Sequence, residues 1–331
     1  MRTKSACLAL AVLLLFLIPT PSSLIPESAA ADYPSRPVRV LIPFTAGSAA
    51  DIIARAMEPA MRERLGQPFV VDNRGGAGGN IAAEMTAKAA PDGYTVMMAT
   101  IGTHAINHAL YSKLSFHPQR DFTPVGLTGE SPNALVTHPK LPVNSIQDLI
   151  ALAKSRPGQL NYGSSGAGTT VHLSAELFGV MTGTRMIHVP HKGAAEALAS
   201  LLGGQTDLMF ASLSSSIPLI KAGRLKAFGV TGAKRSPSIP ELPTIAEAAN
   251  LPGYEASAWW GIVGPAGMPK AAVAALSKAT LAALEDPGVK TRLFNAGVEI
   301  RTSTPQEFAA YIASEMQKWA KVVKASGARA D

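Results

Sequence analysis

The sequence predicts an α/β protein of two lobes with mostly parallel sheets. Short apolar runs alternate with amphipathic helical patterns along almost the whole chain, which is typical of α/β folds. Strand-to-helix turns rich in small residues recur at 45–51, 73–80 and 163–170. Two further segments, 121–126 and 252–261, are expected to cross between the lobes, because roughly 300 residues are enough for two hydrophobic cores.

The first half of the chain begins with the apolar run Val38–Phe44, which leads into the turn Thr45–Asp51. The pattern then repeats, with apolar runs short enough for strands and periodic segments long enough for helices. Up to residue 182, strands are expected over 38–44, 69–72, 94–99, 133–137 and 160–162, and helices over 49–65, 79–89, 145–155 and 170–182.

The second half continues in the same way, with a proline-rich connector at 236–243. Gly223, Gly253 and Gly327 stand where a helix or loop is expected to stop. Strands are expected here over 186–189, 207–211, 226–231, 258–263 and 298–301, and helices over 193–203, 214–222, 270–285 and 305–324.

The first residues have the pattern of an export signal. Met1–Lys4 is basic, and Ala6–Ile18 is an apolar core of signal-peptide length, too short for a membrane span. Ala29–Ala31 fits an A-x-A cleavage site, so residues 1–31 are expected to be removed near Ala31. The only cysteine, Cys7, lies in the signal, which excludes disulfides and cysteine-based metal sites from the exported chain.

The charge balance suits an anionic ligand. The signal carries two basic residues and one acidic residue, so the formal net charge falls from +7 to +6 once it is removed. A mildly basic protein attracts small anions. The sequence shows no basic run interleaved with aromatic residues, which argues against nucleic acid as a partner, and no later apolar segment is long enough to span a bilayer.

The small-residue turns predict where an anion would bind. Such turns leave backbone N–H groups free, and the positive end of the following helix dipole adds to their attraction for anions. Ligands of open α/β sheets bind at the carboxyl ends of strands, so two lobes would present their turns to one cleft.

Eight motifs, in chain order, give the sequence a resemblance to a known family. The chain resembles the extracytoplasmic solute receptors of tripartite tricarboxylate transporters, also called Bug receptors. The motifs are PFTAGSAAD (43–51), VDNRGGAGG (71–79), PDGYT (91–95), YGSSG (162–166), HVPHKG (188–193), GGQTD (203–207), LPT (242–244) and the segment from WG to PAGMP (260–269). Two positions depart from the family pattern: Ser48 replaces a second glycine, and His191 replaces the usual tyrosine.

The resemblance implies a periplasmic-binding-protein-like fold of the Venus flytrap type, with hinge strands that cross between the lobes. One lobe would combine 32–125 with 256–331, and the other would be 126–255. It further implies a periplasmic monomer without a cofactor, which captures a small carboxylate and delivers it to a membrane permease. A sensor that presents its ligand to a kinase, and an exported hydrolase, are the alternatives.

The candidate ligand-binding residues lie in the turns and at strand ends, where backbone N–H groups and hydroxyls could hold a carboxylate. Thr100 follows a strand, and Asp207 is expected to end a strand that points toward the cleft, whereas Asp51 is expected to start a helix. The candidates are Thr45, Gly47, Ser48, Gly78, Thr100, Ser164, Ser165, Gly166, Thr169, Thr170 and Asp207.

Three other chemistries fit the residues poorly. Ser165 and His172 resemble a nucleophile and a base, but Ala167 stands where the G-x-S-x-G elbow needs its last glycine. A dinucleotide loop would need glycine in place of Ile81. His188 and His191 lack nearby carboxylates, so no metal site is expected.

Overall fold

The computed structural model of the protein describes residues 33–166, 168–191, 193–327, 329 and 330. The expected export signal and its cleavage near Ala31 lie outside these residues. No helix within the described part is long and apolar enough to cross a membrane.

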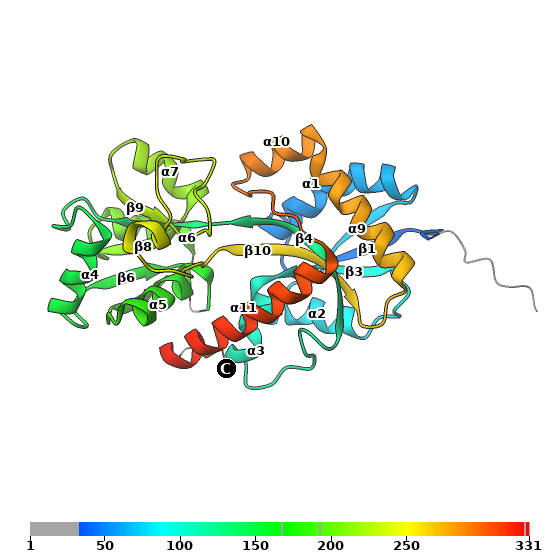
Figure 1. The fold of residues 1–331 in the computed structure, drawn as a ribbon, viewed down its shortest axis with the longest axis horizontal. Helices are drawn as coiled ribbons and strands as arrows, with labels where there is room; N and C mark the ends of the chain where they lie inside the picture. Colours follow the sequence, from blue (N-terminus) through cyan, green and yellow to red (C-terminus); the bar gives the residue numbers. More distant parts are fainter. Residues whose placement is uncertain (1–32, 167, 192, 328, 331) are drawn as a thin grey trace, which may run out of the picture. The chain divides into compact units, whose positions relative to one another are not determined.

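Five strands form the first sheet, in the order β2-β1-β3-β10-β4 (Figure 1). β1 (Val38–Ile42), β2 (Phe69–Asn73) and β3 (Thr95–Thr100) are parallel to one another. β10 (Ala258–Pro265) is antiparallel to both of its neighbours, β3 and β4 (Phe122–Ser131).

Helices cover both faces of this sheet. Successive side chains of β1 point to opposite faces, and Val40, Leu41 and Ile42 are all buried, so each face must be covered. Val40 and Ile42 pack in one core with residues of α1 (Ala49–Leu65), α9 (Lys270–Glu285) and α10 (Pro287–Asn295). Leu41 points the other way, into a core that includes residues of α2 (Asn80–Ala87) and α11 (Pro305–Ser326).

The second sheet has the order β7-β6-β8-β5-β9. Its strands are β5 (Asn133–Thr137), β6 (Asn161–Ser164), β7 (Ile187–Pro190), β8 (Leu208–Ser212) and β9 (Lys226–Val230). Leu135 and Phe210 share a core with α4 (Ile146–Ser155), α5 (Thr170–Thr182) and α8 (Ile245–Ala249). Val136 and Met209 pack on the opposite face with α6 (Ala194–Leu202) and α7 (Leu213–Lys221).

The α/β prediction is confirmed, and in each sheet four of the five strands run in one direction, so the sheets are mostly parallel but mixed. In each sheet one strand is antiparallel to both neighbours: β10 in the first and β5 in the second. β5 follows β4 of the first sheet after a single residue, and β10 returns from the second sheet after α8 and residues 250–257.

Other differences concern elements with weak sequence signals. The expected strand 298–301 is only an isolated bridge between Glu299 and Glu130, while the expected crossing at 121–126 is the beginning of β4. Between β3 and the short helix α3 (Asn107–Leu110), the chain forms a π-helix, Gly102–Ile106, which the sequence did not predict.

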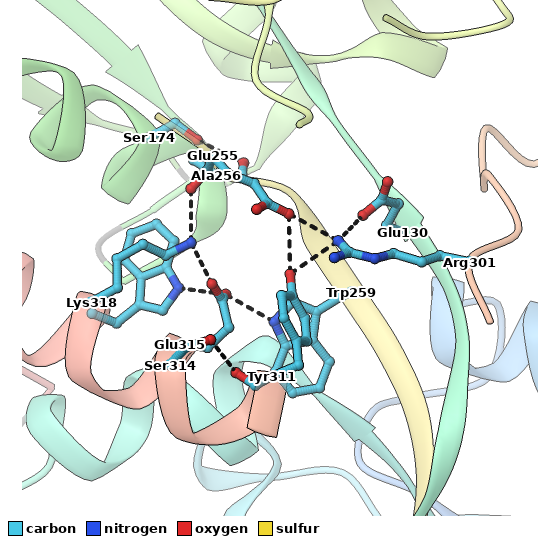
Figure 2. Close-up of polar contacts among 11 residues, drawn as sticks. Glu130, Ser174, Glu255, Ala256, Trp259, Arg301, Tyr311, Ser314, Glu315 and Lys318 are labelled. Carbon is cyan, nitrogen blue, oxygen red and sulfur yellow. Dashed lines mark hydrogen bonds and ion pairs between the residues drawn. The ribbon is translucent and has the colours of Figure 1, made fainter. Parts of the chain in front are cut away.

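Arg301 links the two chain crossings to α11 (Figure 2). Its guanidinium donates to Glu130 at the end of β4, at 2.6 Å, and to Glu255 just before β10, at 2.9 Å. It also lies 3.3 Å from the Tyr311 hydroxyl of α11. The outgoing and returning segments are therefore joined through one side chain.

Glu315 of α11 is a second junction, and it is 3 % exposed. Its carboxylate accepts the indole N–H of Trp259 from β10 at 3.1 Å and that of Trp319 at 2.9 Å. Lys318 completes the set with an ion pair to the same carboxylate and donates to the Glu255 carbonyl at 2.9 Å (Figure 2). Each oxygen of the buried Glu315 carboxylate therefore has a hydrogen-bond or ion-pair partner among the described residues.

Candidate functional site

The turn between β1 and α1 is built around the carboxylate of Asp51. The Gly47 N–H donates to Asp51 Oδ2 at 2.9 Å, and the Ser48 hydroxyl caps α1 by accepting the Asp51 N–H at 3.4 Å. Arg55 and Asn73 donate to Oδ1 at 2.9 and 3.0 Å. Burial raises the pKa of this carboxyl, but the hydrogen bonds outweigh it and hold the pKa below its ordinary value of 3.8.

Two further turns contact this loop at the carboxyl ends of β2 and β3. A β-carbon on Gly79 would lie 2.7 Å from Thr103 Cγ2 and 2.9 Å from Pro43 Cβ, so the three turns touch there. The Thr100 hydroxyl accepts the Thr103 N–H at 3.2 Å and is buried within its own turn. Gly78 is exposed at a φ of 64°, which favours glycine.

The second-sheet turn after β6 is organised by Ser164. Its hydroxyl is fully buried, accepts the Gly166 N–H at 3.1 Å and lies 2.6 Å from His188 Nε2. The Ser164 side chain therefore shapes the turn from within, and the neighbouring Ser165 is left partly exposed.

The start of α5 repeats the plan at the start of α1. The Thr169 hydroxyl caps α5 by accepting the His172 N–H at 3.3 Å. The Gly168 N–H, directly before the cap, donates to His172 Nδ1 at 3.1 Å. His172 thus does for the second loop what Asp51 does for the first. In both helices the first-turn N–H groups have no partner within the helix and point toward the loop.

One short helix, α3, contacts the Gly78 turn of the first sheet and the Gly168 loop of the second. From α3, Asn107 Nδ2 donates to the Gly78 carbonyl at 3.0 Å. On the same helix, Leu110 Cδ2 lies 2.8 Å from the position that a β-carbon on Gly168 would take. Three residues of helix rise only about 4.5 Å, so the first-sheet turns and the second-sheet loop lie on the same side of the protein.

The predicted residues fall into two groups and one outlier. The first-sheet group is Thr45, Gly47, Ser48, Gly78 and Thr100; the second-sheet group is Ser164, Ser165, Gly166, Thr169 and Thr170. Several of their polar groups hold the loops in shape. The hydroxyls of Thr45, Ser165 and Thr170 have no hydrogen-bond partner among the described residues and are the ones available to a ligand.

Asp207 does not belong with them, and the prediction that it ends a strand is wrong. It precedes β8, and its carboxylate accepts the N–H of Asn161, the first residue of β6, at 2.9 Å. β6 and β8 are parallel, so Asp207 lies at the end of the sheet opposite Ser164. An apolar run predicts that a strand is present. It does not predict whether a neighbouring aspartate lies before the strand or at its carboxyl end.

Two contributors were missed. The pattern Gly-(Ser/Thr)-x-x-(Asp/His), present at 47–51 and 168–172, could have identified His172 as the partner of a loop amide. Nothing comparable identifies Asn107, because a π-helix precedes it and shifts the helical register. Among the described residues, no group of three or more His, Cys, Asp or Glu side chains is placed to hold a metal ion.

Replacing Asp51 with Ala is expected to lower the free energy of unfolding at pH 7 by about 2–3 kcal/mol, because a buried carboxylate that accepts three hydrogen bonds is lost. The lowered pKa means that this contribution is complete above pH 4 and fades as the pH falls below 3.8. Urea denaturation of the variant and wild type at pH 7 and pH 3 measures both effects.

The matched control is Asp148→Ala. The exposed Asp148 accepts the Asn144 N–H at 2.9 Å at the start of α4, in the same arrangement but without arginine or asparagine donors. A loss of about 1 kcal/mol is expected there. An equal loss for the two variants would show that the extra partners of Asp51 contribute nothing.

Comparison with known proteins agrees with this architecture. The family model described as "Tripartite tricarboxylate transporter family receptor" matches residues 53–328. BugT of Bordetella pertussis is 35% identical over 298 residues, covering 90% of this chain and 91% of that protein.

Two solved structures are similar as well. Rpa4515 of R. palustris with adipate is 41% identical, with a TM-score of 0.72 over 89% of this chain and 99% of that one. MatC of Rhodopseudomonas palustris with bound malate is 34% identical, with a TM-score of 0.69 over 88% and 100%. The shared fold is two-lobed, and the family consists of periplasmic solute-binding receptors and not of enzymes. This chain belongs to the tripartite tricarboxylate transporter receptor family.

Proposed function

We propose that this protein binds a small dicarboxylate between its two glycine-rich loops and delivers it to the permease of a tripartite tricarboxylate transporter. The observation that carries the proposal is the contact of α3 with the Gly78 turn through Asn107 and with the Gly168 loop through Leu110, which places turns of the two sheets side by side. Rpa4515 with adipate and MatC with malate support the class of ligand.

The donors suit a carboxylate without a fixed positive charge. The Thr45, Ser165 and Thr170 hydroxyls and the N–H groups of the first two residues of α1 and of α5 are the donors that the loops leave available. A hydrogen bond to a charged group contributes about 1.5–3 kcal/mol. Four or five of them, less the cost of association and closure, correspond to roughly micromolar affinity.

The lobes of the proposed receptor follow the sheets. We assign 33–131 and 258–331 to one lobe and 133–254 to the other, since β4 pairs with β10 as far as Ser131. This moves the first boundary from 125 to 131. The permease would then recognise the closed form, in which the two lobes enclose the ligand. The protein would act as a monomer in the periplasm, after cleavage of the signal near Ala31.

Calorimetric titration with adipate and malate tests the binding step. Micromolar affinity and a raised melting temperature are expected, and the diol of the same length as adipate should give neither. Failure of both acids, and of a wider panel of dicarboxylates, would contradict the assignment. Uptake of the bound acid by cells with and without the gene tests delivery separately.

Thr45→Val and Thr170→Val are each expected to weaken dicarboxylate binding about tenfold, since each removes one hydroxyl donor from a different loop. Calorimetry at one pH measures the change. Thr291→Val is the control, because this exposed threonine lies on α10 and its hydroxyl donates to the Pro287 carbonyl of the same helix. Unchanged affinity in either loop variant would remove that hydroxyl from the site.

A further inference from the structure

The acceptor that holds the second loop is an imidazole, whereas its counterparts are carboxylates. Gly47 donates to Asp51 before α1, and Asn144 donates to Asp148 before α4. Before α5 the same bond runs from Gly168 to His172 Nδ1, at 3.1 Å. Among these three helix starts, only the one in the second ligand loop depends on an imidazole, whose ordinary pKa is 6.5.

The bond fixes the state of this histidine. A backbone N–H can donate only to an unprotonated nitrogen, so Nδ1 carries a lone pair and the single ring proton sits on Nε2. Protonation would place an N–H opposite the Gly168 N–H, and the bond would be replaced by repulsion. Gly168 has a φ of 75° and packs against Leu110 of α3, so displacing it disturbs the contact that brings the loops together.

We propose that His172 positions the second loop for ligand binding through its Nδ1 atom, and that protonation of this imidazole releases the loop. The effect on affinity rests on the proposed function, but the effect on the loop does not. His172 acts on the ligand only through Gly168, so it is a positioning residue.

The surroundings of His172 favour its neutral form. The His188 ring, from β7, stacks on it at 3.9 Å between centroids, and the Tyr162 ring, from β6, lies 6.2 Å away. Glu176, on α5 itself, lies 3.7 Å from Nε2, but its carboxylate also accepts the Tyr162 hydroxyl.

One further charged side chain, Arg185, lies near this cluster. Arg185 lines the same cavity as Glu176 and His188, to which α11 contributes Ala325 and Ser326. β8, which also packs on α5, has no titratable side chain. Burial, followed by the charge of His188, lowers the pKa of His172 from 6.5 to about 4.

The direction of the pH effect follows from this shift. The released loop exposes a histidine of ordinary pKa, so it binds a proton more readily than the ordered loop does. The ordered loop is therefore fully favoured above about pH 6.5 and loses its advantage as the pH falls toward 4. Between pH 7.5 and 5.5 the equilibrium should shift roughly tenfold toward release.

Nuclear magnetic resonance of the ligand-free protein tests the loop directly. With glycine amides and histidine rings labelled with ¹⁵N, the Gly168 amide is expected to titrate together with the His172 ring. The Gly47 amide, bonded to Asp51, should stay constant over the same range. His172→Asn keeps an acceptor near the Nδ1 position but cannot be protonated, so its Gly168 signal should not move between pH 7.5 and 5.5.

Several outcomes would overturn the proposal. They are a Gly168 amide that follows the His188 ring, one that stays fixed while His172 titrates, or one that titrates equally in His172→Asn. If wild type unfolds before His172 titrates, His172→Asn should remain folded to a lower pH, and an identical unfolding pH contradicts the proposal.

Adipate titration at pH 7.5 and 5.5 extends the test to affinity. Wild type should lose more affinity than His172→Asn, by up to about tenfold, because the acid's own protonation is the same for both proteins. Absence of adipate binding to either protein would contradict the proposed ligand class, while the amide signals would still decide the role of His172.

Discussion

Replacing Glu315 with Ala is expected to lower the free energy of unfolding by about 3–5 kcal/mol, because removing one partner from a buried ionic cluster leaves the others unpaired. Two buried indole N–H groups, from Trp259 and Trp319, would lose their acceptor, and Lys318 would lose its ion pair. These contacts tie β10 to α11, so the loss falls on the segment that returns from the second sheet (Figure 2).

Urea denaturation monitored by tryptophan fluorescence measures the effect, with Glu315→Gln as an intermediate that keeps an acceptor oxygen. Glu285→Ala is the matched control, since Glu285 pairs with Lys290 at 2.5 Å on the exposed surface. A change within about 0.5 kcal/mol is expected there. A loss below 1 kcal/mol for Glu315→Ala would show that the cluster does not stabilise the fold.

Gly261→Ala is expected to cost about 3 kcal/mol, since overpacking a rigid core forces backbone shifts. A β-carbon at this position of β10 would lie 2.4 Å from Phe308 Cζ and 2.8 Å from the Gly126 carbonyl oxygen. Phe308 is fully buried in the core under α11, and the carbonyl belongs to the paired strand β4, so neither can move aside. Thermal and urea unfolding measure the loss.

Gly193→Ala is the control for this substitution. Gly193 has extended backbone, and a β-carbon there would meet nothing within 4 Å. Gly193 is the N-cap of α6, where alanine is less favourable than glycine, so a loss of no more than about 1 kcal/mol is expected. If Gly261→Ala behaves in the same way, the packing of Phe308 against β10 is looser than the distances indicate.

Local patterns predicted most helices and strands, since their signals lie within the elements. The helices over 49–65 and 270–285 are found at the expected bounds, because an apolar stripe and a clear start mark each of them. The direction of a strand within its sheet, in contrast, is not encoded in the strand's own residues. Whether β10 runs parallel or antiparallel to β3 depends on where the chain comes from, and no residue within 258–265 records that.

The positions of the loops could be predicted, but not which of their polar side chains hold the loop in shape and which stay free for a ligand. Glycine and hydroxyl residues mark both turns, yet Ser164 and Thr100 are turned inward while Thr45 stays exposed. Asp207 shows the same limit, because its partner Asn161 is 46 residues away in the sequence. Long-range pairs of this kind decide which polar side chains remain free for a ligand.

The place of β10 between β3 and β4 also bears on how the molecule is made. During synthesis, which begins at the amino end, β3 and β4 are made long before β10, the strand that pairs with both of them. Until β10 has been made as far as Pro265, the edges of β3 and β4 that pair with it are unpaired, and unpaired strand edges promote aggregation. A nascent fragment that stops short of this point is thus not a small folded domain but an unfinished sheet in need of protection.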